Sequence, residues 1–115
     1  MRLRAYSLSD IVQVTDIDVL DRMLEDWDYV VINFSAPAWC VPCRRLAPHY
    51  LAAVSKLPGV VFVEVDIDKV NEPFINKYSL MSVPTLKFYS MGEFVSDLKS
   101  RTSVPLITEI KELVK

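Results

Sequence analysis

Two short apolar runs with a longer helical pattern between them constrain the fold of this chain most. Residues 29–34 and 60–65 are almost continuously apolar, which is typical of central strands covered on both faces. Between the two runs, apolar residues recur at helical spacing along residues 40–57. A strand, a helix and a second strand in this order predict a parallel β–α–β unit and an α/β fold.

Weaker patterns extend this unit on both sides. The expected elements are a short edge strand at 11–15, a helix capped by Asp16 or Asp18, a short helix capped by Asn71, a hairpin over 85–89 and 94–98, and a helix over 104–114. The resulting order, βαβαβαββα, predicts a single domain over residues 1–115. We expect a central mixed sheet of about five strands, flanked by four helices on both faces.

Charge and hydropathy argue against several classes of protein. The chain carries 13 Lys and Arg against 15 Asp and Glu, without a basic block, so we expect no nucleic-acid partner. No apolar run approaches the ~20 residues that a membrane span needs, so we expect no membrane association. The first residues lack the apolar segment of a secretory signal, and the cysteine usage suits a reducing compartment. These features predict a cytoplasmic location.

Both cysteines of the chain, Cys40 and Cys43, lie where the long helix is expected to begin. A thiol attacks as its thiolate, and the N–H groups and dipole at a helix N-terminus stabilise that negative charge. Residues 29–63 contain no carboxylate, so the local field also favours a thiolate. The second cysteine lies about one turn further on, within reach of a disulfide formed at the first. We therefore predict Cys40 as a nucleophile and Cys43 as the resolving thiol.

Other roles for a C-x-x-C pair fit the sequence less well. A structural zinc site needs four ligands, and the only further ligand of the N/S type is His49, on another face of the helix. A second alternative is that the cysteines are inert core thiols. The flanking residues argue against it, because Trp39, Pro42 and Arg44 suit a helix start that faces solvent. We expect no metal. We also expect no organic cofactor, because the chain has no G-x-G-x-x-G motif.

Several motifs at matching separations resemble those of the thioredoxin family over residues 12–114. They are the strand at 30–35, the WCVPC sequence at 39–43, Pro48, the strand at 63–68, and the Ser-Val-Pro-Thr sequence at 82–85. The resemblance implies a thioredoxin fold and a Cys40–Cys43 pair that cycles between dithiol and disulfide. It also implies that a cis bond precedes Pro84 beside the cysteines, and that the backbone of Val83 pairs with an extended substrate segment.

The chain departs from the family pattern around the cysteines. Val41-Pro42 stands where most members have Gly-Pro, which places a β-branched side chain in the substrate-binding surface beside Trp39. Asn33 stands where many members have a buried Asp that helps to deprotonate the second cysteine. An amide cannot take a proton, so we expect slower resolution, with Glu64 as a partial replacement through water.

A second group of departures concerns the rim of the site. The loop that precedes Trp39, residues 36–38, is one residue longer than is usual in the family. We therefore expect its position at the mouth of the site to differ from that in other members. Residues 98–100 replace a region that often contains glycine. Their side chains are expected to crowd the docking groove and to weaken binding of general thioredoxin partners.

The function predicted on this basis is thiol-disulfide exchange by a protein disulfide reductase. Its partners would be proteins that contain disulfides and an electron donor that resembles thioredoxin reductase. A binding or accessory subunit with little redox turnover remains the alternative, and the unusual groove residues keep it open. An oxidase in an oxidising compartment is a third possibility.

Overall fold

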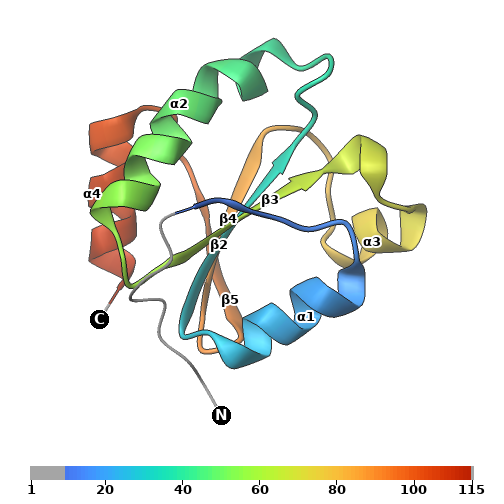
Figure 1. Ribbon diagram of the computed structural model, residues 1–115, viewed down its shortest axis with the longest axis horizontal. Coiled ribbons are helices and arrows are strands. Elements are labelled where there is room, and N and C mark those ends of the chain that lie inside the picture. The colour runs from blue at the N-terminus through green and yellow to red at the C-terminus, as the bar shows by residue number, and fades with distance from the viewer. Residues whose placement is uncertain (1–9, 115) are drawn as a thin grey trace.

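The computed structural model describes residues 10–114 and arranges them as one mixed sheet covered by helices on both faces (Figure 1). The elements are β1 (Val12–Gln13), α1 (Ile17–Asp26), β2 (Tyr29–Ser35), α2 (Val41–Lys56), β3 (Val61–Asp66), the 3-10 helix η1 (Ile67–Lys69), α3 (Glu72–Lys77), β4 (Thr85–Ser90), β5 (Glu93–Leu98) and α4 (Ser103–Leu113). The expected order of strands and helices is confirmed. The expectation about a secretory signal concerns residues 1–9, which lie outside the described residues.

The strand order is β1-β3-β2-β4-β5. β1 and β2 both run parallel to β3, whereas β4 pairs antiparallel with β2 and β5 antiparallel with β4. β2 is therefore the central strand, and every residue of it after Tyr29 is buried. This burial explains why its sequence reads as a continuous apolar run rather than an alternating one.

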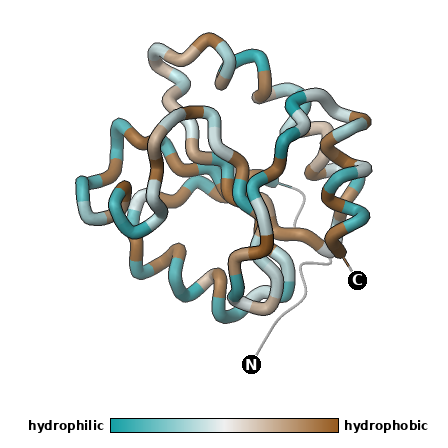
Figure 2. Tube along the Cα trace, turned by 180° about the vertical axis from the view of Figure 1, so that it is seen from behind, coloured by the Kyte–Doolittle hydropathy of each residue, from teal (hydrophilic) through white to brown (hydrophobic). Residues whose placement is uncertain are grey.

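The two faces of β2 pack against different pairs of helices. Val31 belongs to a core cluster with α2 and α4, which includes Leu46 and Ile110. Val30, Ile32 and Phe34 point to the other face, where the core contains residues of α1 and α3. Hydropathy alternates along the helices, as Figure 2 shows, because each helix buries one side on the sheet.

Polar contacts fix the positions of the helices. Tyr50 of α2 donates its hydroxyl to the carbonyl oxygens of Val63 (2.7 Å) and Val31 (3.2 Å), which attaches the helix to β3 and β2. Burial, together with the charge of Glu64, raises the pKa of Tyr50 well above its ordinary value. The phenol therefore remains a donor, and the helix that carries the cysteines is held to the sheet.

α4 begins with an N-terminal contact from another helix. Thr102, its N-cap residue, makes no side-chain capping bond. Instead, Nδ1 of His49 on α2 accepts the N–H of Ser103 (3.0 Å) and lies 2.6 Å from the Ser103 hydroxyl oxygen. Because an N–H can only donate, Nδ1 is the acceptor and the ring proton is on Nε2. His49 thus links α2 to α4.

The loop from β5 to α4 is held by Glu109. Its carboxylate accepts the N–H groups of Lys99 (3.0 and 3.1 Å) and Ser100 (2.9 Å). Burial alone would raise the pKa of Glu109, but these hydrogen bonds and the nearby charge of Arg101 outweigh it and lower the pKa below its ordinary value. The side chain of Arg101 is consequently presented from a fixed backbone.

Candidate functional site

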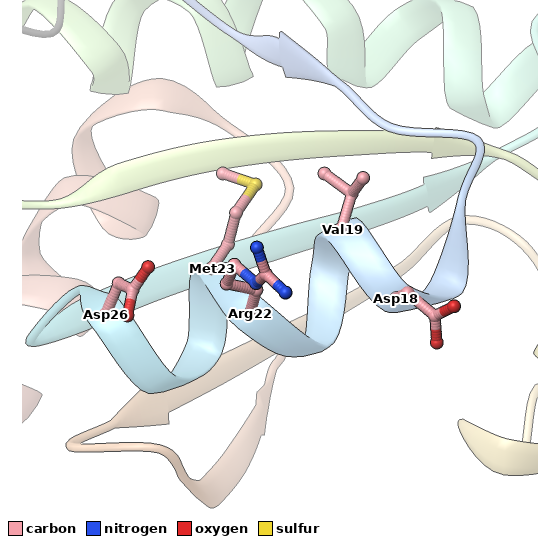
Figure 3. A pocket seen from close by; sticks show the side chains of 5 residues that line it. All are labelled: Asp18, Val19, Arg22, Met23 and Asp26. Atoms are coloured by element: carbon pink, nitrogen blue, oxygen red, sulfur yellow. The ribbon is translucent and has the colours of Figure 1, made fainter.

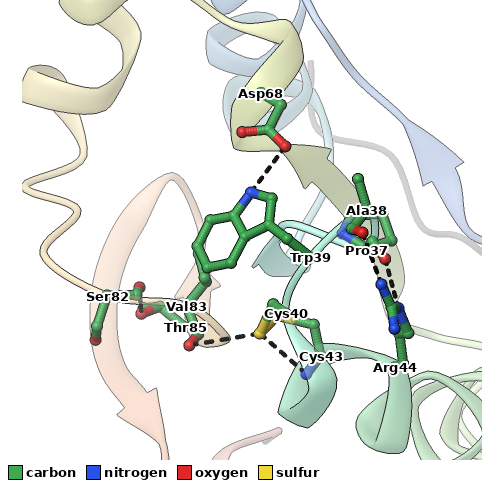
Figure 4. The surroundings of a disulfide bond; sticks show 10 residues. All are labelled: Pro37, Ala38, Trp39, Cys40, Cys43, Arg44, Asp68, Ser82, Val83 and Thr85. Atoms are coloured by element: carbon green, nitrogen blue, oxygen red, sulfur yellow. Dashed lines mark hydrogen bonds between the residues drawn. A yellow bond between two sulfur atoms is a disulfide. The ribbon is translucent and has the colours of Figure 1, made fainter.

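Cys40 and Cys43 form a disulfide at the N-terminus of α2 (Figure 4). Their Cα atoms are 5.2 Å apart, within the usual range for a disulfide. The chain leaves β2 and turns through residues 36–39, where the N–H of Cys40 donates to the carbonyl oxygen of Ala36 (2.9 Å). This turn delivers Cys40 to the N-cap position of α2.

The N-terminus of α2 favours negative charge on the sulfur of Cys40. Sγ accepts the N–H of Cys43 at 3.2 Å, and the first turn contains no acidic residue. A hydrogen bond to the charged form and the positive end of a helix dipole both stabilise a thiolate. Both cysteines are buried, with Cys40 5% exposed and Cys43 2% exposed.

The loop before β4 lies directly beside the cysteines. The Val83–Pro84 bond is cis, as the family resemblance predicts. The carbonyl oxygen of Val83 is 3.8 Å from Sγ of Cys40, and Val83 packs against the buried cluster of Ala36, Cys40 and Cys43. Thr85 donates its hydroxyl to the carbonyl oxygen of Ser82 (2.7 Å), which closes the loop. The structure thus brings together the two segments that the sequence predicts at one site.

Trp39 lies on the surface, with its ring held in place. The side chain is 59% exposed, and its indole N–H donates to Oδ2 of Asp68 (3.0 Å). Asp68 belongs to η1, directly after β3, and its N–H donates to the side chain of Asp66 (3.0 Å). Asp68 was not among the predicted site residues, although two aspartates at the end of a strand that reaches the same sheet edge were a usable signal.

Arg44 anchors the approach to the cysteines. Its Nε donates to the carbonyl oxygen of Pro37 (2.8 Å) and its Nη2 to that of Ala38 (2.6 Å) (Figure 4). The longer loop expected at residues 36–38 is therefore fastened to the first turn of α2. The guanidinium also adds positive charge close to the cysteines.

Asn33 is buried in the middle of β2 and is 1% exposed. Its Oδ1 has no hydrogen-bond partner, which is uncommon for a buried polar atom. Its register partner on β3 is Glu64, whose Oε1 accepts the side-chain N–H of Gln13 (2.8 Å). The partial replacement of the family's carboxylate by Glu64, through water, stays a prediction.

Two clefts are each lined by a residue next to a cysteine and by a residue of the cis-proline loop. One, of about 160 Å³, is lined by Trp39, Ile67, Ile75, Leu80, Met81, Ser82 and Val83. The other, which we call the basic cleft, has a volume of about 550 Å³. The basic cleft is lined by Pro42, Arg45, Leu46, His49, Pro84, Arg101 and Thr102. Val41, between the cysteines, is 47% exposed.

The expectation that the side chains of residues 98–100 crowd the groove is wrong for Leu98. Leu98 is 1% exposed in the core, and the backbone of Lys99 and Ser100 is turned toward Glu109. Arg101 and Thr102, the next residues along the loop, line the cleft instead. Sequence analysis did not identify these two residues, nor the exposed Met81.

A further pocket lies away from the cysteines on α1 (Figure 3). Its volume is about 300 Å³, and its lining residues are Asp18, Val19, Arg22, Met23 and Asp26. α1 covers the face of the sheet opposite α2, so this pocket does not contribute to the cysteine site. Within residues 10–114, no three His, Cys, Asp or Glu side chains are grouped so that they could hold a metal ion.

Comparison with known proteins agrees with this geometry. The thioredoxin family model matches residues 10–112. Thioredoxin-3 of Dictyostelium discoideum is 39% identical over 99 residues, which cover 86% of this chain and 92% of that protein. The structure of oxidised thioredoxin from Plasmodium falciparum superimposes with a TM-score of 0.78, at 29% identity, over 90% of this chain and 98% of that one.

A longer relative shares the same segment. Protein disulfide-isomerase A3 of Gallus gallus is 42% identical over 86 residues, which are 74% of this chain but 17% of that protein. The chain therefore spans about a sixth of the length of this relative.

No helix within residues 10–114 of this chain is both long enough and apolar enough to cross a membrane.

Proposed function

The chain belongs to the thioredoxin family of thiol-disulfide oxidoreductases, and on this premise we propose that it reduces disulfides in proteins, with Cys40 as the nucleophile. The observation that carries the proposal is the contact of Cys40 Sγ with the N–H of Cys43 at the start of α2. This position stabilises the thiolate of Cys40, the form that attacks a substrate disulfide. Cys43 lies one turn behind, where it can reach the same atom.

The reaction proceeds in two exchanges. The Cys40 thiolate attacks one sulfur of a substrate disulfide, and the other substrate sulfur leaves as a thiolate that takes a proton from water. The Cys43 thiolate then attacks Cys40 Sγ, which releases the second substrate sulfur and leaves the Cys40–Cys43 disulfide. Two electrons pass to the substrate, and the chain ends in the disulfide state of Figure 4.

We assign substrate binding to the exposed rim of the site. The backbone of Val83 would pair with an extended substrate segment, since its carbonyl already lies beside Sγ of Cys40. Trp39, Val41 and Pro42 are exposed around the cysteines and would cover the rest of that segment, with Pro84 beneath it. Asn33 would act indirectly, by leaving the second exchange without an internal proton acceptor.

The electron donor and the location are also proposals. A reductase that resembles thioredoxin reductase would restore the dithiol, because the reaction consumes two electrons in each cycle. We place the protein in the cytoplasm, because its only two cysteines both belong to the exchange site and a reducing compartment keeps such a pair in use. A coupled assay with NADPH and thioredoxin reductase tests the donor.

Insulin reduction, with dithiothreitol as electron source, tests the main proposal. We expect turnover by the native chain, background rate for Cys40→Ser, and an accumulating mixed disulfide for Cys43→Ser. Ser55→Ala, at the far end of α2, is the matched control and should keep full activity. If the native chain is no faster than Cys40→Ser and still binds a partner after both cysteines are replaced, the chain is a binding subunit instead.

A further inference from the structure

The basic cleft carries positive charge without an acidic group among its lining residues. Its charged side chains, Arg45 on α2 and Arg101 before α4, are both exposed. His49 also lines the cleft, and its Nδ1 is occupied by Ser103, which leaves Nε2 as a donor. The polar side chains of the cleft are therefore suited to donate hydrogen bonds to an anion.

Arg101 is positioned by its own loop. Its Nη1 donates to the carbonyl oxygens of Leu98 (2.7 Å) and Ser100 (3.0 Å). A guanidinium has five N–H groups, so those of Nε and Nη2 remain available for a ligand. The side chain is thus partly ordered before binding, which reduces the entropy lost when a ligand binds.

Two carboxylates near the site, those of Glu109 and Asp68, accept hydrogen bonds from other residues of the chain. Glu109 weakens the field of Arg101, but its oxygens accept the N–H groups of Lys99 and Ser100. Asp68 accepts the indole N–H of Trp39, and Figure 4 shows it beyond the ring from the cysteines. Charge is therefore divided across the site, with acidic groups beyond Trp39 and basic groups in the cleft beside Pro42 and Pro84.

We propose that this chain selects disulfide substrates that carry an acidic residue close to the cysteine attacked by Cys40, and that the substrate carboxylate binds Arg45 and Arg101 in the basic cleft. This inference rests on the proposed function and specifies its substrate class. Guanidinium groups match carboxylates in shape and charge. The same cleft repels a lysine at that position, which adds discrimination against the wrong substrate.

Three peptide disulfides that differ only in the residues flanking the cysteine, glutamate, glutamine or lysine, test the proposal. For the native chain we expect kcat/KM about 3- to 10-fold higher with glutamate than with glutamine, because each exposed ion pair contributes modestly. The lysine peptide should be the slowest. The preference should act mainly through KM and should shrink toward unity in about 1 M salt, where charges are screened within ~3 Å.

Substitution of both arginines completes the test. In the double variant Arg45→Gln, Arg101→Gln, the ratio of kcat/KM between the glutamate and glutamine peptides should fall to about 1. Arg22→Gln removes one exposed charge on the opposite face and should keep the native ratio. Equal rates for glutamate and glutamine peptides, or a preference that survives in the double variant, would overturn the proposal. Failure of the native chain to reduce any of the peptides would contradict the proposed function instead.

Discussion

The indole N–H of Trp39 donates to Oδ2 of Asp68 over 3.0 Å, which holds a largely exposed ring beside the disulfide. An exposed aromatic side chain without this bond would sample several rotamers. The contact connects the segment after β3, which carries Asp68, with the start of α2, which carries the cysteines.

Asp68→Ala should therefore release the ring while leaving the cysteines in place. We expect KM for protein disulfides to rise about 2- to 5-fold, with kcat little changed, because one hydrogen bond to a charged group contributes about 1 kcal/mol at an exposed position. Asp68→Asn keeps an acceptor and should behave like the native chain. Steady-state kinetics of the three proteins checks this, and an unchanged KM in Asp68→Ala would show that the ring needs no such support.

Asn33→Asp should accelerate the second exchange. The carboxylate would occupy the place of an amide whose Oδ1 has no partner, and it could take the proton of Cys43. We expect faster resolution of the mixed disulfide at neutral pH, measured by rapid quench. No gain in that rate would contradict the account of Asn33.

The same substitution should also make stability depend on pH. Burial raises the pKa of the new carboxyl above its unfolded value of about 3.9, so the variant loses stability as the pH rises above that value. Asn33→Leu, close to the native shape, should be neutral or stabilising, because it removes an unpaired buried polar group. Urea unfolding of both variants between pH 4 and 8 measures the two effects.

Glu109→Gln should loosen the loop that carries Arg101. The native carboxylate accepts N–H groups from Lys99 and Ser100, and we expect the variant to lose about 1–2 kcal/mol at neutral pH. Because the pKa of Glu109 is lowered in the folded chain, this contribution is complete above about pH 4.3 and is lost as the pH falls through the folded value. Urea midpoints of both proteins should therefore converge toward pH 2. A difference that does not change with pH would rule out this role of the charge.

His49→Ala should remove the group that caps α4. The N–H of Ser103 loses its acceptor, and a lost N-terminal cap costs about 0.5–2 kcal/mol. Thr102→Asp places a capping carboxylate at the N-cap position, which has no side-chain bond in the native chain. The second substitution should restore most of the loss, as thermal unfolding can show. Equal stability of His49→Ala and the native chain would mean that water serves the same N–H.

The strands of the sheet could be predicted from the sequence because each central strand is marked by its own run of apolar residues. The apolar runs at β2 and β3 identify central strands, and Asn71 caps α3 as expected. The edge strand was less clear: the β-rich run at residues 11–15 forms only Val12–Gln13, because β1 pairs on one side alone. A strand with one neighbour gains fewer hydrogen bonds to extend it.

The cysteine pair could also be predicted, whereas its surroundings could not. Cys40 and Cys43 lie on one helix start, so their spacing fixes their relation. Asp68 reaches Trp39 across 29 residues of sequence, and Ser103 reaches His49 across 54. Such contacts depend on how loops from different elements meet at one edge of the sheet. Arg101 enters the cleft because Glu109 holds the preceding backbone, and no local pattern encodes that.

The reactivity of Cys40 in the reduced chain tests the central claim most directly. The dithiol form is treated with iodoacetamide across pH 4 to 10, and the modified cysteine is identified by mass spectrometry. We predict that Cys40 reacts first, with a midpoint below the ~8.5 of an ordinary thiol, because α2 and the N–H of Cys43 stabilise its thiolate. A midpoint at or above that value, or faster modification of Cys43, would contradict the account.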